Sequence, residues 1–297
     1  MASEVTGTAP TGAFWVHIGH GKTGTTALQH HFRARAAVDA GLLYPDVGQM
    51  PSGAHHKLFP LDAPEFTPAS RALQARLAEE MAARGPGVAV LISSEHLCYM
   101  RPVQVARLAR LWQDEPPRIL YYIRRQEALI ESAFRWVQVA EPGKYTDIDA
   151  FVAGQARAFD FELRLTPWRR AFGDGAIRLR LYDRRTCAGD IAADAEAVMG
   201  LPALDLPGGR VQHRPSLGPG LTRRLMAFDA ARPARPERRA FLDALYAEAA
   251  RGDAAPEPGF LTDALKAEIR ARYADANARI AEALLDPEQA ALFLDPA

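Results

Sequence analysis

The sequence predicts an α/β protein with three layers, in which a mostly parallel central sheet is flanked by helices on both faces. Segments typical of strands alternate with segments typical of helices, and this order favours a parallel sheet. Residues 87–94 (GVAVLISS) form a continuous apolar run, which is typical of a strand buried on both faces. The chain has 297 residues and is 48% hydrophobic, so it can bury the core that this fold needs.

The predicted strands are short and apolar. They cover residues 14–18 (FWVHI), 87–94, 118–123 (RILYYI) and 176–182 (AIRLRLY). Each of them is followed by a segment with helical character, which is the arrangement that brings successive strands into one parallel sheet.

Helices are predicted over residues 25–40, 67–84, 102–114, 126–140 and 147–171. Gly41 ends the first of them. Thr67 and Pro68 provide an N-cap and a first-turn proline for the second, and Pro102 opens the third. Helix boundaries are therefore best defined where a proline or a glycine stands next to the periodic segment.

The C-terminal third is predicted to be helical, with a Pro- and Gly-rich loop over 201–220 and tail helices at about 220–251 and 260–284. The charged stretch 232–239 (RPARPERR) is interpreted as a solvated connector. We interpret residues 1–297 as one domain, with a flexible leader over 1–12 and a helical C-terminal extension over 220–297.

Composition argues against several classes of protein. Thirty-six basic residues balance 36 acidic ones, so overall charge predicts neither nucleic-acid binding nor attachment to an anionic membrane. Cys98 and Cys187 are too few for a disulfide framework and are expected to be reduced thiols. The sequence shows no signal peptide and no apolar run of membrane-span length, so we expect no membrane insertion and a cytoplasmic location.

The segment HIGHGKTGTT, residues 17–26, lies where the first strand ends and the first helix begins. Such a junction directs backbone N–H groups and the helix dipole toward an anion, most often a phosphate. Gly21, Lys22 and Thr23 could end a Walker A loop, but the first glycine of that motif would fall on Val16, inside the strand. The spacing therefore excludes a standard ATP or GTP loop.

The longer stretch GHGKTGTTALQHHF, residues 19–32, resembles the 5′-phosphosulfate loop of sulfotransferases that use 3′-phosphoadenosine 5′-phosphosulfate (PAPS). The carbohydrate, heparan-type and bacterial members are the most similar. The resemblance implies a P-loop-like fold, PAPS as donor, no metal, and a hydroxyl or amine acceptor, with a carbohydrate favoured over other small molecules. Its expected donor-binding residues are Gly21 and Gly24 for close backbone approach, Thr23, Thr25 and Thr26 as hydroxyl donors, and Lys22 to neutralise the leaving phosphate.

A second match lies in YYIRRQEALIESAF, residues 121–134. In the family that the chain resembles, an arginine at a strand end and a serine eight residues later bind the 3′-phosphate. Arg124 and Ser132 have this spacing, whereas Arg125 is one position out of register. The resemblance implies that these two residues hold the second phosphate of the donor.

A weaker third match covers residues 159–202, where Tyr182 and Asp183 occupy the place of the Tyr-Glu pair of the family. The resemblance implies that Tyr182 lies near the adenine, although a tyrosine that ends a strand can equally be a core residue. In the family, a basic loop in the C-terminal part folds back over the nucleotide. Arg210 and Arg214 are the candidates for that contact here, and we assign it to Arg214.

Transfer of a sulfonate group requires a base for the acceptor as well as a cation for the leaving group. The second long strand ends in LISSEHL, so Glu95 and His96 emerge at a carboxyl end, where open α/β sheets bind their ligands. Glu95 is the favoured base and His96 the reserve. A histidine titrates near neutral pH without help, whereas a carboxylate needs burial to raise its pKa. Glu95 could also be a first-turn acid behind a Ser94 cap.

The remaining candidates are less specific. His17, His20, His30 and His31 lack the spacing and the extra ligands of a metal site, so none is expected to bind metal. His20 is interpreted as a loop residue near the sulfonate. His55 and His56 are interpreted as part of a surface loop, with the border of the acceptor pocket as the alternative. Arg135 and Gln138 are placed by position alone as possible acceptor contacts.

Two other functions remain open. A small-molecule kinase with a degenerate phosphate loop would turn over ATP with Mg²⁺. A non-catalytic relative would bind a nucleotide or a glycan without turnover. The sequence leaves the acceptor and the oligomeric state undetermined.

Overall fold

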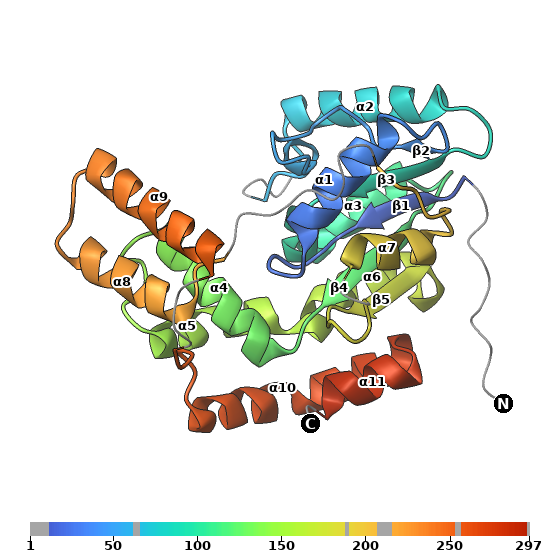
Figure 1. Cartoon of the computed structure of the whole chain (residues 1–297). Helices are drawn as coiled ribbons and strands as arrows, with labels where there is room; N and C mark the ends of the chain where they lie inside the picture. Colours follow the sequence, from blue (N-terminus) through green and yellow to red (C-terminus); the bar gives the residue numbers. More distant parts are fainter. Residues whose placement is uncertain (1–11, 62–65, 188–189, 207–215, 253–256, 296–297) are drawn as a thin grey trace. The chain divides into compact units, whose positions relative to one another are not determined.

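A computed structural model describes residues 12–61, 66–187, 190–206, 216–252 and 257–295 of the chain. Its sheet consists of β1 (Phe14–His17), β2 (Leu42–Leu43), β3 (Ala89–Ser93), β4 (Arg118–Ile123) and β5 (Ile177–Leu181). The strand order is β2-β3-β1-β4-β5, and every pairing in it is parallel (Figure 1). The predicted α/β class with a parallel central sheet is confirmed.

The described helices are α1 (Thr25–Ala36), α2 (Pro68–Ala82), α3 (Pro102–Leu111), α4 (Gln126–Ala140), α5 (Ile148–Gln155), α6 (Phe161–Phe172), α7 (Ile191–Met199), α8 (Pro219–Ala230), α9 (Arg235–Arg251), α10 (Asp263–Leu284) and α11 (Pro287–Leu294). Short 3₁₀ turns include η1 (His56–Leu58), η2 (Glu95–Tyr99) and η3 (Ala156–Phe159). The predicted start of α2 is confirmed, because the Thr67 hydroxyl accepts a hydrogen bond from the Ser70 N–H.

The chain divides into two compact units. The first contains Met1–Arg124, Phe161–Val211 and Ala276–Ala297, and the second contains Arg125–Asp160 and Gln212–Asp275. The first unit holds the sheet. The second unit is helical and contains α4, α5, α8, α9 and the start of α10. The interpretation of residues 1–297 as one domain stays a prediction.

Helices cover both faces of the sheet in the first unit. On one face, Leu28 and Phe32 of α1 and Ile191 of α7 pack in one cluster with Trp15 and Leu120 of the strands. Successive side chains along a strand point to opposite faces of the sheet, so residues next to these in sequence face the other side. There Phe14 contacts Trp112, and Tyr121 contacts Phe161 at the start of α6.

A buried ion network joins α1 to α7. The guanidinium of Arg35 has no exposed surface and donates to Glu196 at 2.5 Å and to Asp39 at 2.8 Å. Nε2 of His31 lies 2.6 Å from the same Glu196 oxygen. A buried carboxylate needs such donors to offset its lost hydration, so this network sets how α7 packs on α1.

The second unit has its own small core. Leu221 and Leu225 of α8 pack with Leu245 of α9. Arg238 donates to the Gln138 and Val139 carbonyls in the last turn of α4, where a cation also complements the helix dipole.

Two predicted helices are interrupted. The segment 147–171 forms α5, η3 and α6, because Asp160 is extended at φ −84° and ψ 99°. On a continuous helix Phe159 and Phe161 would lie about 160° apart around the helix axis. Here Phe159 is buried in the second unit and Phe161 in the first. The segment 220–251 divides at Arg232, whose φ is +50° and which precedes Pro233. Part of the predicted connector 232–239 therefore belongs to α9.

Other differences are smaller. α1 ends at Ala36 rather than residue 40, and the two-residue strand β2 and the helix α11 were not predicted as separate elements. α11 lies against β5, where the Gln289 side chain accepts the Leu181 N–H at 2.7 Å and so pairs an edge group of the sheet. Within the described ranges, no helix is both long and apolar enough to cross a membrane.

Candidate functional site

The candidate site lies at the carboxyl ends of β1, β3 and β4. The chain leaves β1 toward β2 on one side of the sheet, and it leaves β4 toward β5 on the other. The strand order therefore reverses between β1 and β4, which is where open α/β sheets bind their ligands. The loop of residues 18–24 follows β1, and the turn η2 follows β3.

The loop between β1 and α1 has an unusual backbone. Lys22 has a φ of +71° and Gly24 a φ of +78°, whereas Thr23 between them is not in the left-handed region. Alternation of this kind makes successive N–H groups converge into an anion-binding concavity. A non-glycine residue in the left-handed region costs about 1–3 kcal/mol and is concentrated at functional sites. The Lys22 backbone thus marks this loop as the first candidate for an anion site.

The loop is braced from inside. The Thr23 hydroxyl has no exposed surface and donates to the His20 carbonyl at 2.6 Å. Nδ1 of buried His20 in turn donates to the Gly21 carbonyl at 3.0 Å. The Thr23 hydroxyl therefore braces the loop, and its predicted contact with phosphate stays a prediction. The Thr26 side chain is exposed.

The glycines of the loop serve different purposes. A Cβ on Gly19 would lie 2.4 Å from Nε2 of His17, and one on Gly24 would lie 2.9 Å from Ile191 and 3.1 Å from Tyr182. A Cβ on Gly21 would meet no described atom within 4 Å. Gly19 and Gly24 are thus required by packing, whereas Gly21 leaves open space on the side of the loop where a ligand could approach.

Glu95 begins η2 and lies next to the start of α1. Gln29 donates to its Oε2 at 2.9 Å, Thr25 hydrogen-bonds to the carboxylate, and Nε2 of His56 lies 3.4 Å from Oε2. The side chain keeps 20% of its surface exposed. The carboxylate is therefore held by the first helix after the loop and still reaches solvent.

These contacts set the charge of Glu95. Burial by itself would raise the pKa of Glu95, but hydrogen bonds from Thr25, Gln29 and its own backbone N–H, with His56 nearby, lower the pKa below 4.5. Glu95 is thus ionised at neutral pH. The net effect is a lowered pKa, because the hydrogen-bond donors outweigh desolvation.

A second polar layer lies below the carboxylate. His17 is paired with Ser93 in the sheet, and its Nδ1 lies 2.8 Å from the Ser93 hydroxyl, which also accepts from Gln29 at 3.3 Å. Burial lowers the pKa of His17 to about 4, although Glu95 acts in the opposite direction. His17 is therefore neutral and structural.

The segment with His55 and His56 is part of the site and not a plain surface loop. Nδ1 of buried His55 accepts from the Ser93 N–H at 3.2 Å, and its Nε2 donates to the Pro45 carbonyl at 2.8 Å. His56 stacks on His96 with ring centroids 4.0 Å apart and 9° between the planes. Nδ1 of His96 donates to the Phe59 carbonyl at 3.0 Å, which leaves Nε2 as the basic nitrogen.

Arg124 and Tyr182 also meet at this end of the sheet. The Arg124 guanidinium lies 5.8 Å from the centroid of the Tyr182 ring, and that ring packs beside Gly24. Ser132 belongs to α4 in the second unit and is buried, so its pairing with Arg124 stays a prediction. Arg210 and Arg214 lie outside the described residues.

Other sequence candidates have partners within their own units. Arg135 donates to the Leu217 carbonyl and Gln138 to the Tyr145 carbonyl, so both have internal partners in the second unit. His31 belongs to the buried network of α1 and α7. In the ranges that the structure describes, no group of three or more His, Cys, Asp or Glu side chains is placed to hold a metal ion.

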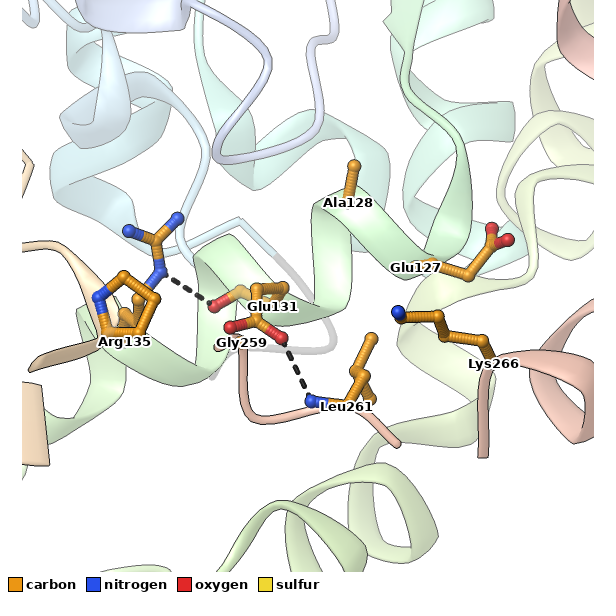
Figure 2. Close-up of a pocket in the computed structure, with 8 residues that line it drawn as sticks. Glu127, Ala128, Glu131, Arg135, Gly259, Leu261 and Lys266 are labelled. Carbon is orange, nitrogen blue, oxygen red and sulfur yellow. Dashed lines mark hydrogen bonds between the residues drawn. The ribbon is translucent and has the colours of Figure 1, made fainter. Parts of the chain in front are cut away.

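A cavity of about 310 Å³ lies in the second unit (Figure 2). The Glu131 carboxylate on its wall accepts the backbone N–H groups of Phe260 and Leu261 at 2.9–3.1 Å. Glu127 pairs with Arg270, and Lys266 pairs with Asp263. Each of these charged groups thus has a partner within the second unit.

Gln29, Thr25 and His56 were missed as partners of Glu95. Thr25 and Gln29 are four residues apart and so share one face of α1. This spacing is the only feature of the local sequence that links the two residues. Their contact with Glu95 spans 66 positions for Gln29, a distance over which residue spacing carries no information.

Comparison with known proteins gives limited similarity. No protein-family model matches the chain. An uncharacterized protein of Archaeoglobus fulgidus is 22% identical over 129 residues, which are 43% of this chain and 34% of that protein. The crystal structure of a sulfotransferase from Alicyclobacillus acidocaldarius has 18% identity and a TM-score of 0.44, and the match covers 79% of this chain and 95% of that one.

The two glycine environments give a stability test. Gly24→Ala is expected to lower the free energy of unfolding by at least about 1–2 kcal/mol, because alanine resists the left-handed backbone and would crowd Ile191. Gly21→Ala is expected to stay within about 0.5 kcal/mol of the unchanged protein. Urea unfolding of both variants measures this, and equal losses would contradict the assignment.

Proposed function

We propose that the protein transfers a sulfonate group from PAPS to a hydroxyl or amine of an acceptor, with a carbohydrate as the favoured acceptor. One observation carries the proposal. A loop with the backbone of an anion site leads directly into α1, and the first residue of that helix holds the ionised Glu95. A site for a negatively charged donor and a site for a proton acceptor therefore adjoin.

The chemistry needs both parts. An acceptor oxygen or nitrogen attacks sulfur and forms a new S–O or S–N bond, while the bond from sulfur to the donor's phosphate oxygen breaks. Lys22 and the N–H groups of the loop stabilise the negative charge on the departing 3′,5′-bisphosphate. The acceptor proton passes to a carboxylate or an imidazole at the site. As in phosphoryl transfer, positioning and electrostatics supply most of the acceleration.

Glu95 is the proposed base, and His96 is the alternative. Geometry favours Glu95, because it bonds to Thr25 at the start of α1, immediately after the loop. His96 offers an imidazole nitrogen, because its Nε2 carries a lone pair while Nδ1 donates to the Phe59 carbonyl. Position is the first requirement of a base, and pKa is the second.

The contacts to the rest of the donor are proposed from the resemblance. Arg124 and Ser132 would bind the 3′-phosphate, and Tyr182 would pack near the adenine. The short distance between the Arg124 guanidinium and the Tyr182 ring supports this, because phosphate and adenine are neighbouring parts of the donor. Arg214 remains a proposal of the sequence alone.

Lys22 gives the test of the function. Lys22→Ala is expected to reduce transfer of labelled sulfonate from PAPS more than about 10²-fold, since the leaving phosphate loses its cation. Lys22→Gly is expected to be equally inactive yet more stable than the alanine variant by roughly 1 kcal/mol, because glycine accepts the left-handed backbone. Lys144→Ala, which removes an exposed lysine of the second unit, serves as control. Unchanged transfer by Lys22→Ala would reject the role of Lys22.

The pH dependence separates the two bases. If Glu95 is the base, activity requires its ionised form and falls only as the pH drops through its lowered pKa, so the acid limb of kcat/KM lies below pH 4.5. Glu95→Gln should then lower kcat and leave the affinity for 3′,5′-ADP nearly unchanged. An acid limb near neutral pH, lost only in His96→Ala, would move the role of base to His96.

A further inference from the structure

Gln29 is a buried side chain that connects the first helix to the proposed base. It lies on α1 one turn after Thr25 and has 2% of its surface exposed. Its Nε2 donates to Oε2 of Glu95 at 2.9 Å and to the Ser93 hydroxyl at 3.3 Å. An ionised carboxylate can only accept, so the amide nitrogen must face Glu95, and the orientation of the amide is fixed by chemistry.

The position of Gln29 matters because α1 begins at the loop. Gly24 ends the loop, and Thr25 and Gln29 follow on one face of the helix, both bonded to Glu95. The same rigid helix therefore fixes the distance between the anion loop and the carboxylate. A base held in this way needs no rearrangement before the reaction.

We propose that Gln29 is a positioning residue, which holds the Glu95 carboxylate in place beside the loop for the proposed sulfonate transfer. This inference rests on the proposed function. The inference adds to the proposed function a residue that touches neither donor nor acceptor and acts only through Glu95. Loss of the amide would release one donor from the carboxylate and let the side chain leave its orientation.

Several titratable groups surround Glu95, and the expected pH effect must be separated from theirs. They are His17 of β1, Tyr44 after β2, His56 of η1, and Cys98 and Tyr99 of η2. Burial raises the pKa of the thiol and of both phenols, and burial lowers the pKa of His17 to about 4 and that of His56 below 6.5. Because His17 and His56 interact with Glu95, the effect of removing Gln29 is read from the carboxyl signal of Glu95 itself.

The test compares Gln29→Met with Gln104→Met. Methionine keeps the volume of glutamine and removes the amide. Gln104 is a matched control, because it is also buried on a helix of the first unit and its amide bonds to backbone groups of Arg101 and Pro60. Both variants lose buried hydrogen bonds, but only one loses a bond to Glu95.

Two measurements are made on each variant. Carbon-13 NMR titration of labelled glutamate in the unliganded protein gives the pKa of Glu95, which is expected to rise in Gln29→Met and to stay unchanged in Gln104→Met. Steady-state kinetics with PAPS is expected to show kcat about 10- to 100-fold lower in Gln29→Met, with the KM for PAPS little changed and the acid limb moved to higher pH. Gln29→Asn, whose shorter amide falls short of Oε2, should behave alike if Gln29→Met folds poorly.

The outcomes separate the two proposals. An unchanged pKa of Glu95 in both Gln29 variants, or a raised pKa with undiminished kcat, would overturn the role of Gln29 and leave the function standing. No transfer by the unchanged protein on any acceptor would overturn the function and this inference with it. In the background of Glu95→Gln, Gln29→Met should cost little further activity, since both changes act on one carboxylate. Fully additive losses would contradict the inference.

Discussion

The parallel pairing of β1 with β3 sets His17 opposite Ser93, and the candidate site depends on that register. Because the two strands end together, the loop after β1 and the turn after β3 emerge side by side. Glu95 then lies within reach of Thr25 and Gln29 on α1. A register shift of one residue would turn Ser93 to the other face of the sheet and remove the support below the carboxylate.

The charge of Glu95 follows from the competition between burial and hydrogen bonding. Burial opposes ionisation, whereas Thr25, Gln29 and the nearby His56 favour it, and the second effect is larger. The result is a carboxylate that is weakly basic but ionised and held in place. Such a group suits a reaction in which the orientation of the base matters more than its proton affinity. The stacked rings of His56 and His96 add an imidazole nitrogen at the same place.

Much of the fold could be predicted from local sequence. The bounds of β4 and α4 agree with the predicted ones, and Pro68 and Pro102 start α2 and α3 as expected. The break at Asp160 was not predicted, because the apolar pattern runs through it, while Phe159 and Phe161 on either side are buried in different units. The spacing of apolar residues predicts a helix, but it does not predict which part of the core each of those residues joins.

The candidate site was predictable only in part, for the same reason. The loop at Lys22 and the strand end at Glu95 each have a local signature. The contacts of Gln29 and His56 with Glu95 connect segments far apart in the chain, so residue spacing does not predict them. His55 and His56 looked like surface residues because a Pro- and Gly-containing segment surrounds them. In the structure that segment returns to the end of β3, where the His55 N–H donates to the Ser93 carbonyl.

The loop at Lys22 is proposed to hold one end of an adenosine 3′,5′-bisphosphate. Titration calorimetry of the unchanged protein with 3′,5′-ADP and with ATP, each with and without Mg²⁺, tests this. We expect 3′,5′-ADP to bind without a metal ion and more tightly than ATP. Binding of ATP that requires Mg²⁺, with no measurable binding of 3′,5′-ADP, would contradict it.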